Sequence, residues 1–161
     1  MSIALDPARS TGVAGLDWVD SEASPADLAG DFTAHLAAVY FLDPPMDVWE
    51  FANAGAVLEE AFGLASLYNY EGVKDYFEPP LVDLFELVDC IGLDGVEEAL
   101  AWSLSVLEGG TLEPRPSSGV IPVLGDCMGW RDVPSDPVNL ASLVFLSIVA
   151  AYNKTANIIS E

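Results

Sequence analysis

The feature that most limits the fold is a series of apolar segments with helical spacing, separated by prolines and glycines. Ser24-Pro25-Ala26-Asp27 combines a typical N-cap, a proline at the first helical position and an acid in the first turn. These signals predict a helix that ends before Asp43-Pro44-Pro45. Ser135-Asp136-Pro137 repeats the signal and predicts a last helix that reaches about Ile158.

Three further helices are expected between these two, because apolar residues recur every three or four positions. Their expected ranges are Asp47 to about Tyr68, Pro79 to Gly92, and Asp94 to Gly110. No segment shows a convincing alternation of apolar and polar residues, which a half-buried strand would need. The sequence therefore predicts an all-α fold, a single-domain helical bundle of about five main helices.

The remaining segments are expected to be irregular. Residues 109–136 carry several prolines and glycines and predict a long loop before the last helix. Residues 1–23 are mixed in character and predict a loosely structured N-terminal arm, in front of an acidic helical domain at 24–161.

Charge is the strongest indication of function. The chain has 26 acidic and 5 basic residues, a net charge of −21, which excludes unaided affinity for nucleic acid or an anionic membrane surface. Between Asp17 and Glu113, Lys74 is the only basic residue. Uncompensated charge opposes a compact fold, so we expect a basic protein partner to benefit from it.

Sequence motifs for catalysis are absent. There is no phosphate-binding loop, dinucleotide fingerprint, zinc-protease motif, nucleophile elbow or EF-hand loop. A single histidine and two cysteines without metal-ligand spacing do not make a metal site. We therefore predict a protein that is not an enzyme and that uses no metal or cofactor.

The two cysteines are expected to be free thiols. No secretory signal is visible near Met1, which predicts a cytoplasmic protein, and a reducing compartment keeps thiols reduced. Cys90 is interpreted as a small core residue on a helix, and Cys127 as a free thiol in the long loop.

Two titratable residues allow two interpretations each. His35 lies on an apolar helix face, where it is either a general base or a half-buried histidine satisfied by an acid or a carbonyl group. Glu59 lies near the face that carries Phe51 and Phe62. It is either a buried acid with a raised pKa or, as we expect, an edge residue whose side chain reaches water.

One segment resembles a known family. Asn69-Tyr70-Glu71-Gly72-Val73-Lys74-Asp75-Tyr76-Phe77 is similar to the Asn-x-Gly-x-x-x-Tyr-Phe segment of the bacterial acidic DNA-mimic protein family, which carries a domain of unknown function found in a neisserial DNA mimic. The resemblance continues through Leu84 to Val88, Ile91-Gly92 and Ala99 to Ala101. It implies an all-α acidic fold and a dimeric decoy that occupies the DNA-binding surface of a helix-turn-helix transcription factor.

The leading hypothesis is an acidic binding protein that covers a basic surface of a DNA-binding regulator, a nuclease or a toxin. The alternatives are an immunity protein that neutralises one cognate toxin, and a salt-adapted protein whose charge only solvates its surface. The predicted assembly is a homodimer, because apolar residues between Leu140 and Val149 nearly encircle the last helix; a central core helix in a monomer is the other interpretation. The expected partner-binding residues are Asp83, Glu86, Asp89, Asp94, Glu97 and Glu98, with Trp102 and Trp130 as aromatic anchors.

Overall fold

The computed structural model describes residues 24–40, 48–64, 70–77, 82–108 and 119–160, and the expected N-terminal arm lies outside these ranges. Within them the chain is all-α, as expected, with no strand. The helices are α2 (Pro25–Tyr40), α3 (Val48–Leu64), α4 (Tyr70–Val73), the 3-10 turn η1 (Lys74–Tyr76), α5 (Leu84–Leu107), α6 (Val120–Met128) and α7 (Pro137–Ser160).

The helix starts follow the capping signals of the sequence. At α2 the Asp27 amide donates to Ser24 Oγ at 3.1 Å, and the Ser24 amide donates to Asp27 Oδ2 at 3.4 Å. At α7 the Asn139 amide donates to Asp136 Oδ2 at 3.0 Å. Each bond satisfies an amide that has no partner within its helix, so these caps fix where the helices begin.

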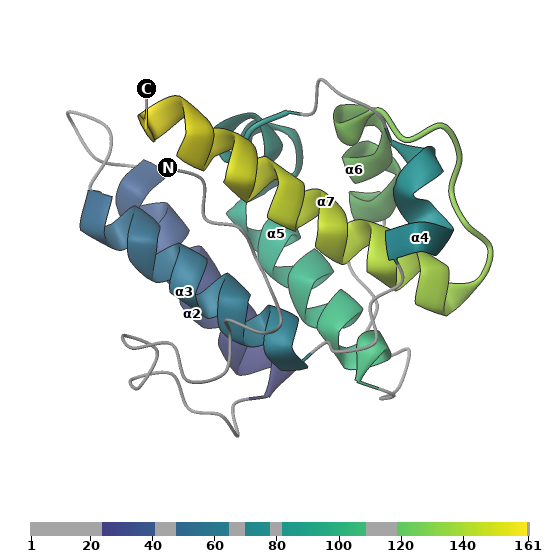
Figure 1. Ribbon diagram of the computed structural model, residues 1–161, viewed down its shortest axis with the longest axis horizontal. Coiled ribbons are helices and arrows are strands. Elements are labelled where there is room, and N and C mark those ends of the chain that lie inside the picture. Colours follow the sequence, from purple (N-terminus) through teal and green to yellow (C-terminus); the bar gives the residue numbers. More distant parts are fainter. Residues whose placement is uncertain (1–23, 41–47, 65–69, 78–81, 109–118, 161) are drawn as a thin grey trace.

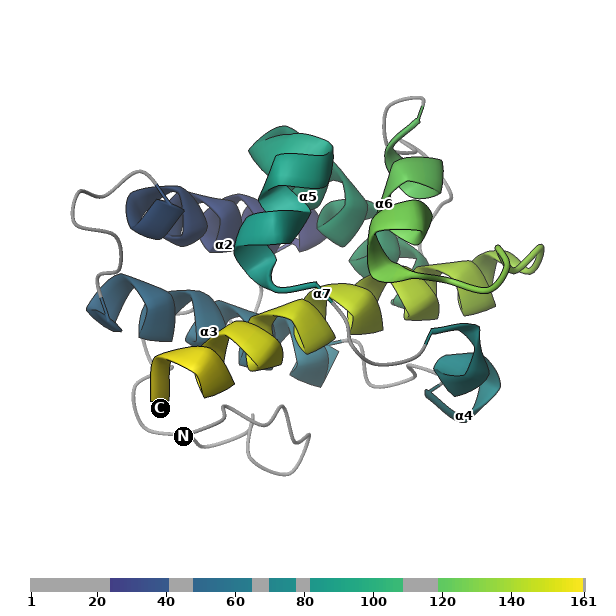
Figure 2. The same cartoon turned by 90° about the horizontal axis from the view of Figure 1, so that it is seen from above.

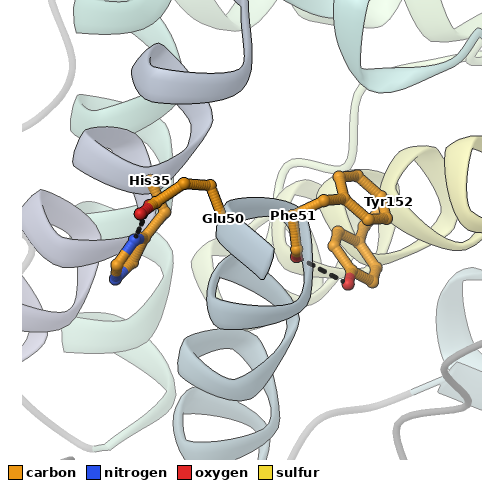
Figure 3. Close-up of polar contacts among 4 residues, drawn as sticks. All are labelled: His35, Glu50, Phe51 and Tyr152. Atoms are coloured by element: carbon orange, nitrogen blue, oxygen red, sulfur yellow. Dashed lines mark hydrogen bonds and ion pairs between the residues drawn. The ribbon is translucent and has the colours of Figure 1, made fainter. Parts of the chain in front are cut away.

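The helices form two layers. Figures 1 and 2 show α3 and α7 in one layer and α2, α5 and α6 in the other. Large aromatic side chains join α3 to α7: Phe51 stacks on Tyr152 with ring centroids 4.4 Å apart, and Phe62 packs against Phe145. The buried Tyr152 hydroxyl donates to the Phe51 carbonyl at 3.0 Å (Figure 3). Burial and the nearby charge of Glu59 raise the pKa of Tyr152.

The third and fourth predicted helices are continuous except for a kink. Gly92 has φ 78° and ψ 163°, which is not helical, and this residue separates the two expected helices within α5. Such backbone angles are accessible almost only to glycine. The prediction of a break at Gly92 is therefore confirmed, although the chain resumes its helix directly after it.

The expected loop at 109–136 is wrong in part, because residues Val120–Met128 form α6. Pro122 is one of the prolines on which the expectation of a loop was based. It stands in the first turn, where the amide needs no partner within the helix, and the first helical bond runs from the Val123 amide to the Gly119 carbonyl at 3.0 Å. A proline at this position therefore costs the helix no hydrogen bond.

The last helix is a core helix. Leu140, Leu143, Val144, Phe145, Ile148 and Val149 are all buried within the single chain, which removes the observation behind the expected homodimer. By length and composition the window Pro137–Asn157 could cross a membrane, with a mean hydropathy of 1.2. However, 72% of this window is buried inside the fold, as in the core helix of a globular protein.

His35 and Glu59, the two titratable residues considered above, both lie at α3: His35 contacts it from α2, and Glu59 belongs to it. His35 is half-buried, and its Nδ1 lies 2.6 Å from Glu50 Oε2, which agrees with the expectation of a histidine satisfied by an acid (Figure 3). Glu59 is only 7% exposed, so the expectation that its side chain reaches water is wrong. The reason is that α7 covers this side of α3 through Tyr152.

Candidate functional site

The candidate site is the outer surface of α5, which we call the acidic face: Asp83, Glu86, Asp89, Asp94, Glu97 and Glu98. Figure 2 shows α5 between α2 and α6, so these two helices bound the face on either side. The apolar residues of α5, such as Leu87 and Leu100, are buried, whereas Glu86, Asp89, Asp94 and Glu97 are exposed. The expectation that these acids point away from the core is confirmed for those four residues.

The first two acids also begin the helix. Asp83 is the N-cap of α5 and forms a capping box with Glu86: the Glu86 amide donates to Asp83 Oδ1 at 2.9 Å, and the Asp83 amide donates to Glu86 Oε1 at 3.4 Å. Substitution of either residue would weaken the start of the helix as well as remove a charge. These two acids are therefore poor choices for a test of binding.

Two other acids face α2. The Tyr40 hydroxyl donates to Asp89, and the Thr33 hydroxyl lies 3.1 Å from Glu97 Oε1. A Cβ at Gly30 would lie 3.7 Å from Glu97 Oε2, an ordinary contact distance, so this carboxylate lies against the backbone of α2. The hydrogen bond to Asp89 is the largest cause of a raised pKa of Tyr40, since ionisation of the phenol would remove the donor.

The helices around the acidic face supply no lysine or arginine to balance its charge, because α2, α5 and α6 contain none. Lys74 pairs with Glu71 at 3.0 Å, and no ion pair joins another described residue to Asp83, Glu86, Asp89, Asp94 or Glu97. Neutral donors bind four of these acids: backbone amides donate to Asp83 and Glu86, and hydroxyl groups donate to Asp89 and Glu97. The negative charge of these four acids therefore remains available to a partner.

Two remaining positions differ from the expectation. Trp102 is 3% exposed and lies in the core, so the prediction that it anchors a partner at the surface is wrong. Trp130 is half-buried, and its indole N–H donates to Ser147 Oγ at 2.9 Å, which ties the end of α6 to α7. Glu98 is half-buried at the edge of the face. Glu108 lies one residue beyond the end of α5, and partial burial raises the pKa of its carboxyl group.

The cysteines are the feature that the sequence analysis missed. Cys90 and Cys127 form a disulfide between α5 and α6, so the expectation of two free thiols is wrong. Cys90 is exposed rather than in the core. One signal could have placed it: Cys90 follows Glu86 by four residues, which puts both on the same side of the helix.

Comparison of the chain with family models, curated proteins and solved structures finds no match to any of them. The described residues also contain no group of three or more histidine, cysteine or acidic side chains placed to hold a metal ion.

Proposed function

We propose that the chain is a non-enzymatic binding protein whose acidic face covers a basic surface of a protein partner, in the manner of a DNA-mimic decoy or inhibitor. The observation that carries the proposal is that three exposed acids of α5, Glu86, Asp89 and Glu97, accept from neutral donors, while α2, α5 and α6 contain no lysine or arginine. Charge of this kind speeds association with a basic surface and sets its orientation.

The spacing of the acids suggests that the partner surface which they contact is one that usually binds DNA. Asp83, Glu86 and Asp89 follow one another at intervals of three residues, which is a rise of about 4.5 Å per step along a helix. Phosphates on one strand of duplex DNA rise by about 3.4 Å per step. A protein that holds a row of phosphates with lysine and arginine would meet carboxylates at a similar interval.

Asp94 allows the cleanest test of the face. It is exposed, and it makes no hydrogen bond or ion pair with another described residue. We expect Asp94→Lys to weaken capture of a basic partner from native lysate at low salt by about tenfold. The substitution replaces a negative charge of the acidic face by a positive one, which repels a basic surface. The matched control is Asp75→Lys on η1, which makes the same change in net charge at an exposed site that packs with α4 rather than α5.

Competition with duplex DNA then separates the candidate functions. A captured partner that loses its DNA in the complex supports the mimic, whereas a partner that still binds DNA contradicts it. Capture of a toxin without a DNA-binding surface would instead identify an immunity protein. Equal capture by Asp94→Lys and Asp75→Lys would refute the assignment of the acidic face. If the chain captures no basic protein, the proposal fails, and the charge serves only to solvate the surface.

A further inference from the structure

The disulfide between α5 and α6 has no role in the proposed function. Cys90 and Cys127 are 37 residues apart in sequence, and their Cα atoms lie 6.5 Å apart. Cys90 is exposed and Cys127 is half-buried. A thiolate in solution can therefore reach the bond, and accessible disulfides are the ones that take part in exchange reactions.

The helix that this bond holds packs on the fold along one side, where Leu124 and Met128 join the core and Val120 and Ile121 are partly buried against it. α6 has nine residues, of which only Leu124, Gly125 and Met128 are buried. Its N-cap is Gly119 in a left-handed conformation, without a side-chain cap. Helices this short are unstable on their own, so α6 depends on its contacts with the rest of the fold.

The segments on either side of the disulfide are attached to the rest of the fold by different contacts. Trp130, just after α6, is tied to α7 by its bond to Ser147, and its amide donates to the Gly125 carbonyl at 2.9 Å. The segment of α5 before its kink is fixed independently, because Leu84 is buried and its amide donates to Thr155 Oγ1 at 2.9 Å. Loss of the disulfide would therefore loosen α6 where it meets α5, while Trp130 stays tied to α7 and this part of α5 stays in place.

We propose that the Cys90–Cys127 bond is a redox-sensitive latch that pins α6 to α5 when oxidised and frees α6 when a dithiol reduces it. The latch does not depend on the partner of the acidic face. Its release would uncover the apolar surface of α5 that Leu124 and Met128 cover, directly beside that face. In a reducing compartment such bonds are usually transient or redox-sensing.

The exchange reaction is balanced by the dithiol. A thiolate of the dithiol attacks Sγ of Cys90, the more exposed of the two residues; the S–S bond breaks, and Cys127 leaves as a thiolate that takes a proton. The second thiol of the reagent then attacks the mixed disulfide and releases Cys90, which is protonated in turn. The protein gains two electrons and two protons, and the dithiol becomes a disulfide.

Backbone amide relaxation by nuclear magnetic resonance tests the latch on the full chain, in its oxidised form and after reduction with dithiothreitol. We expect order parameters in residues 120–128 to fall from about 0.85 to below about 0.6, or relaxation dispersion to appear there, while α3 and α7 keep their values. Air oxidation should restore the original values and remove two titratable thiols. The Cys90→Ser/Cys127→Ser variant is the matched control and should resemble the reduced protein with or without dithiothreitol.

Three results would overturn the latch. Unchanged relaxation in α6 after complete reduction would show that non-covalent contacts hold it. Loss of order in α7 as well would show that the bond staples the whole fold. Failure of dithiothreitol to reduce the native protein would show that the bond is closed to exchange. If the double serine variant does not fold, Cys127→Ser and the reduced wild-type chain provide the same comparison.

Discussion

Removal of the disulfide should lower the free energy of unfolding by an amount that follows from its position in the chain. A bond across 37 residues restricts the unfolded ensemble, and the chain-entropy relation gives about 4 kcal/mol for a loop of this length at 25 °C. Domains usually have about 5–15 kcal/mol of stability, so we expect the reduced chain to remain folded but to unfold at lower urea concentration.

Urea unfolding of the oxidised protein, the reduced protein and the Cys90→Ser/Cys127→Ser variant measures this loss. The slope of the free energy against urea should rise on reduction, because the open unfolded chain exposes more surface. Agreement between the reduced protein and the serine variant would exclude an effect of the thiols themselves. A loss below about 1 kcal/mol, or a full loss with an unchanged slope, would refute the argument from the unfolded state.

Three further substitutions test the local geometry. Gly92→Ala should cost about 1–3 kcal/mol in urea unfolding, because φ 78° and ψ 163° strain any residue with a Cβ; an unchanged midpoint would contradict the kink. Gly125→Ala should cost a similar amount, since its Cβ would lie 2.7 Å from Trp130 Cε3, and Trp130 fluorescence should change with it. Asp89→Asn should lower the pKa of Tyr40, measured as tyrosinate absorbance against a Tyr40→Phe reference. The hydrogen bond to Asp89 stabilises the protonated phenol, and this raises the pKa of Tyr40 in the folded protein. The contribution of this bond to folding stability is therefore complete below about pH 10, and it is lost as the pH rises through the folded pKa.

The capping signals predicted most of the fold because they act over a few neighbouring residues. Ser24 with Asp27, and Asp136 before Pro137, each fix a helix start through bonds that span three positions. Gly92 marks the kink for the same reason, since its backbone angles exclude other residues. Local chemistry of this kind can be recognised without knowledge of the tertiary contacts.

The misses have a different origin, because each depends on packing between distant segments. Cys90 and Cys127 meet only after α6 packs on α5. Glu59 is buried in a part of α3 where Tyr152 of α7 lies close by, and Trp102 is buried in the core. Helical periodicity locates the apolar side of each helix, but not which polar edge a neighbouring helix will cover.

The acidic face should also make stability depend on salt. Like charges three or four apart on a helix cost about 0.2–0.5 kcal/mol per pair, and the exposed side of α5 brings four such pairs together: Asp83 with Glu86, Glu86 with Asp89, Asp94 with Glu97, and Asp94 with Glu98. Screening of these repulsions should therefore raise the free energy of unfolding by about 1–2 kcal/mol between low and high ionic strength.

Urea unfolding at about 10 mM and at 1 M sodium chloride measures this salt effect, because the Debye length falls from about 30 Å to about 3 Å between them. An effect of this size leaves the chain folded at low salt, as a decoy must be in order to bind its partner through charge. Unfolding at low salt would instead identify a salt-adapted protein that depends on screening, and stability that falls with salt would show that the acids of α5 are compensated within the fold. The size of the salt effect thus separates a surface kept for a partner from one kept for its solvent.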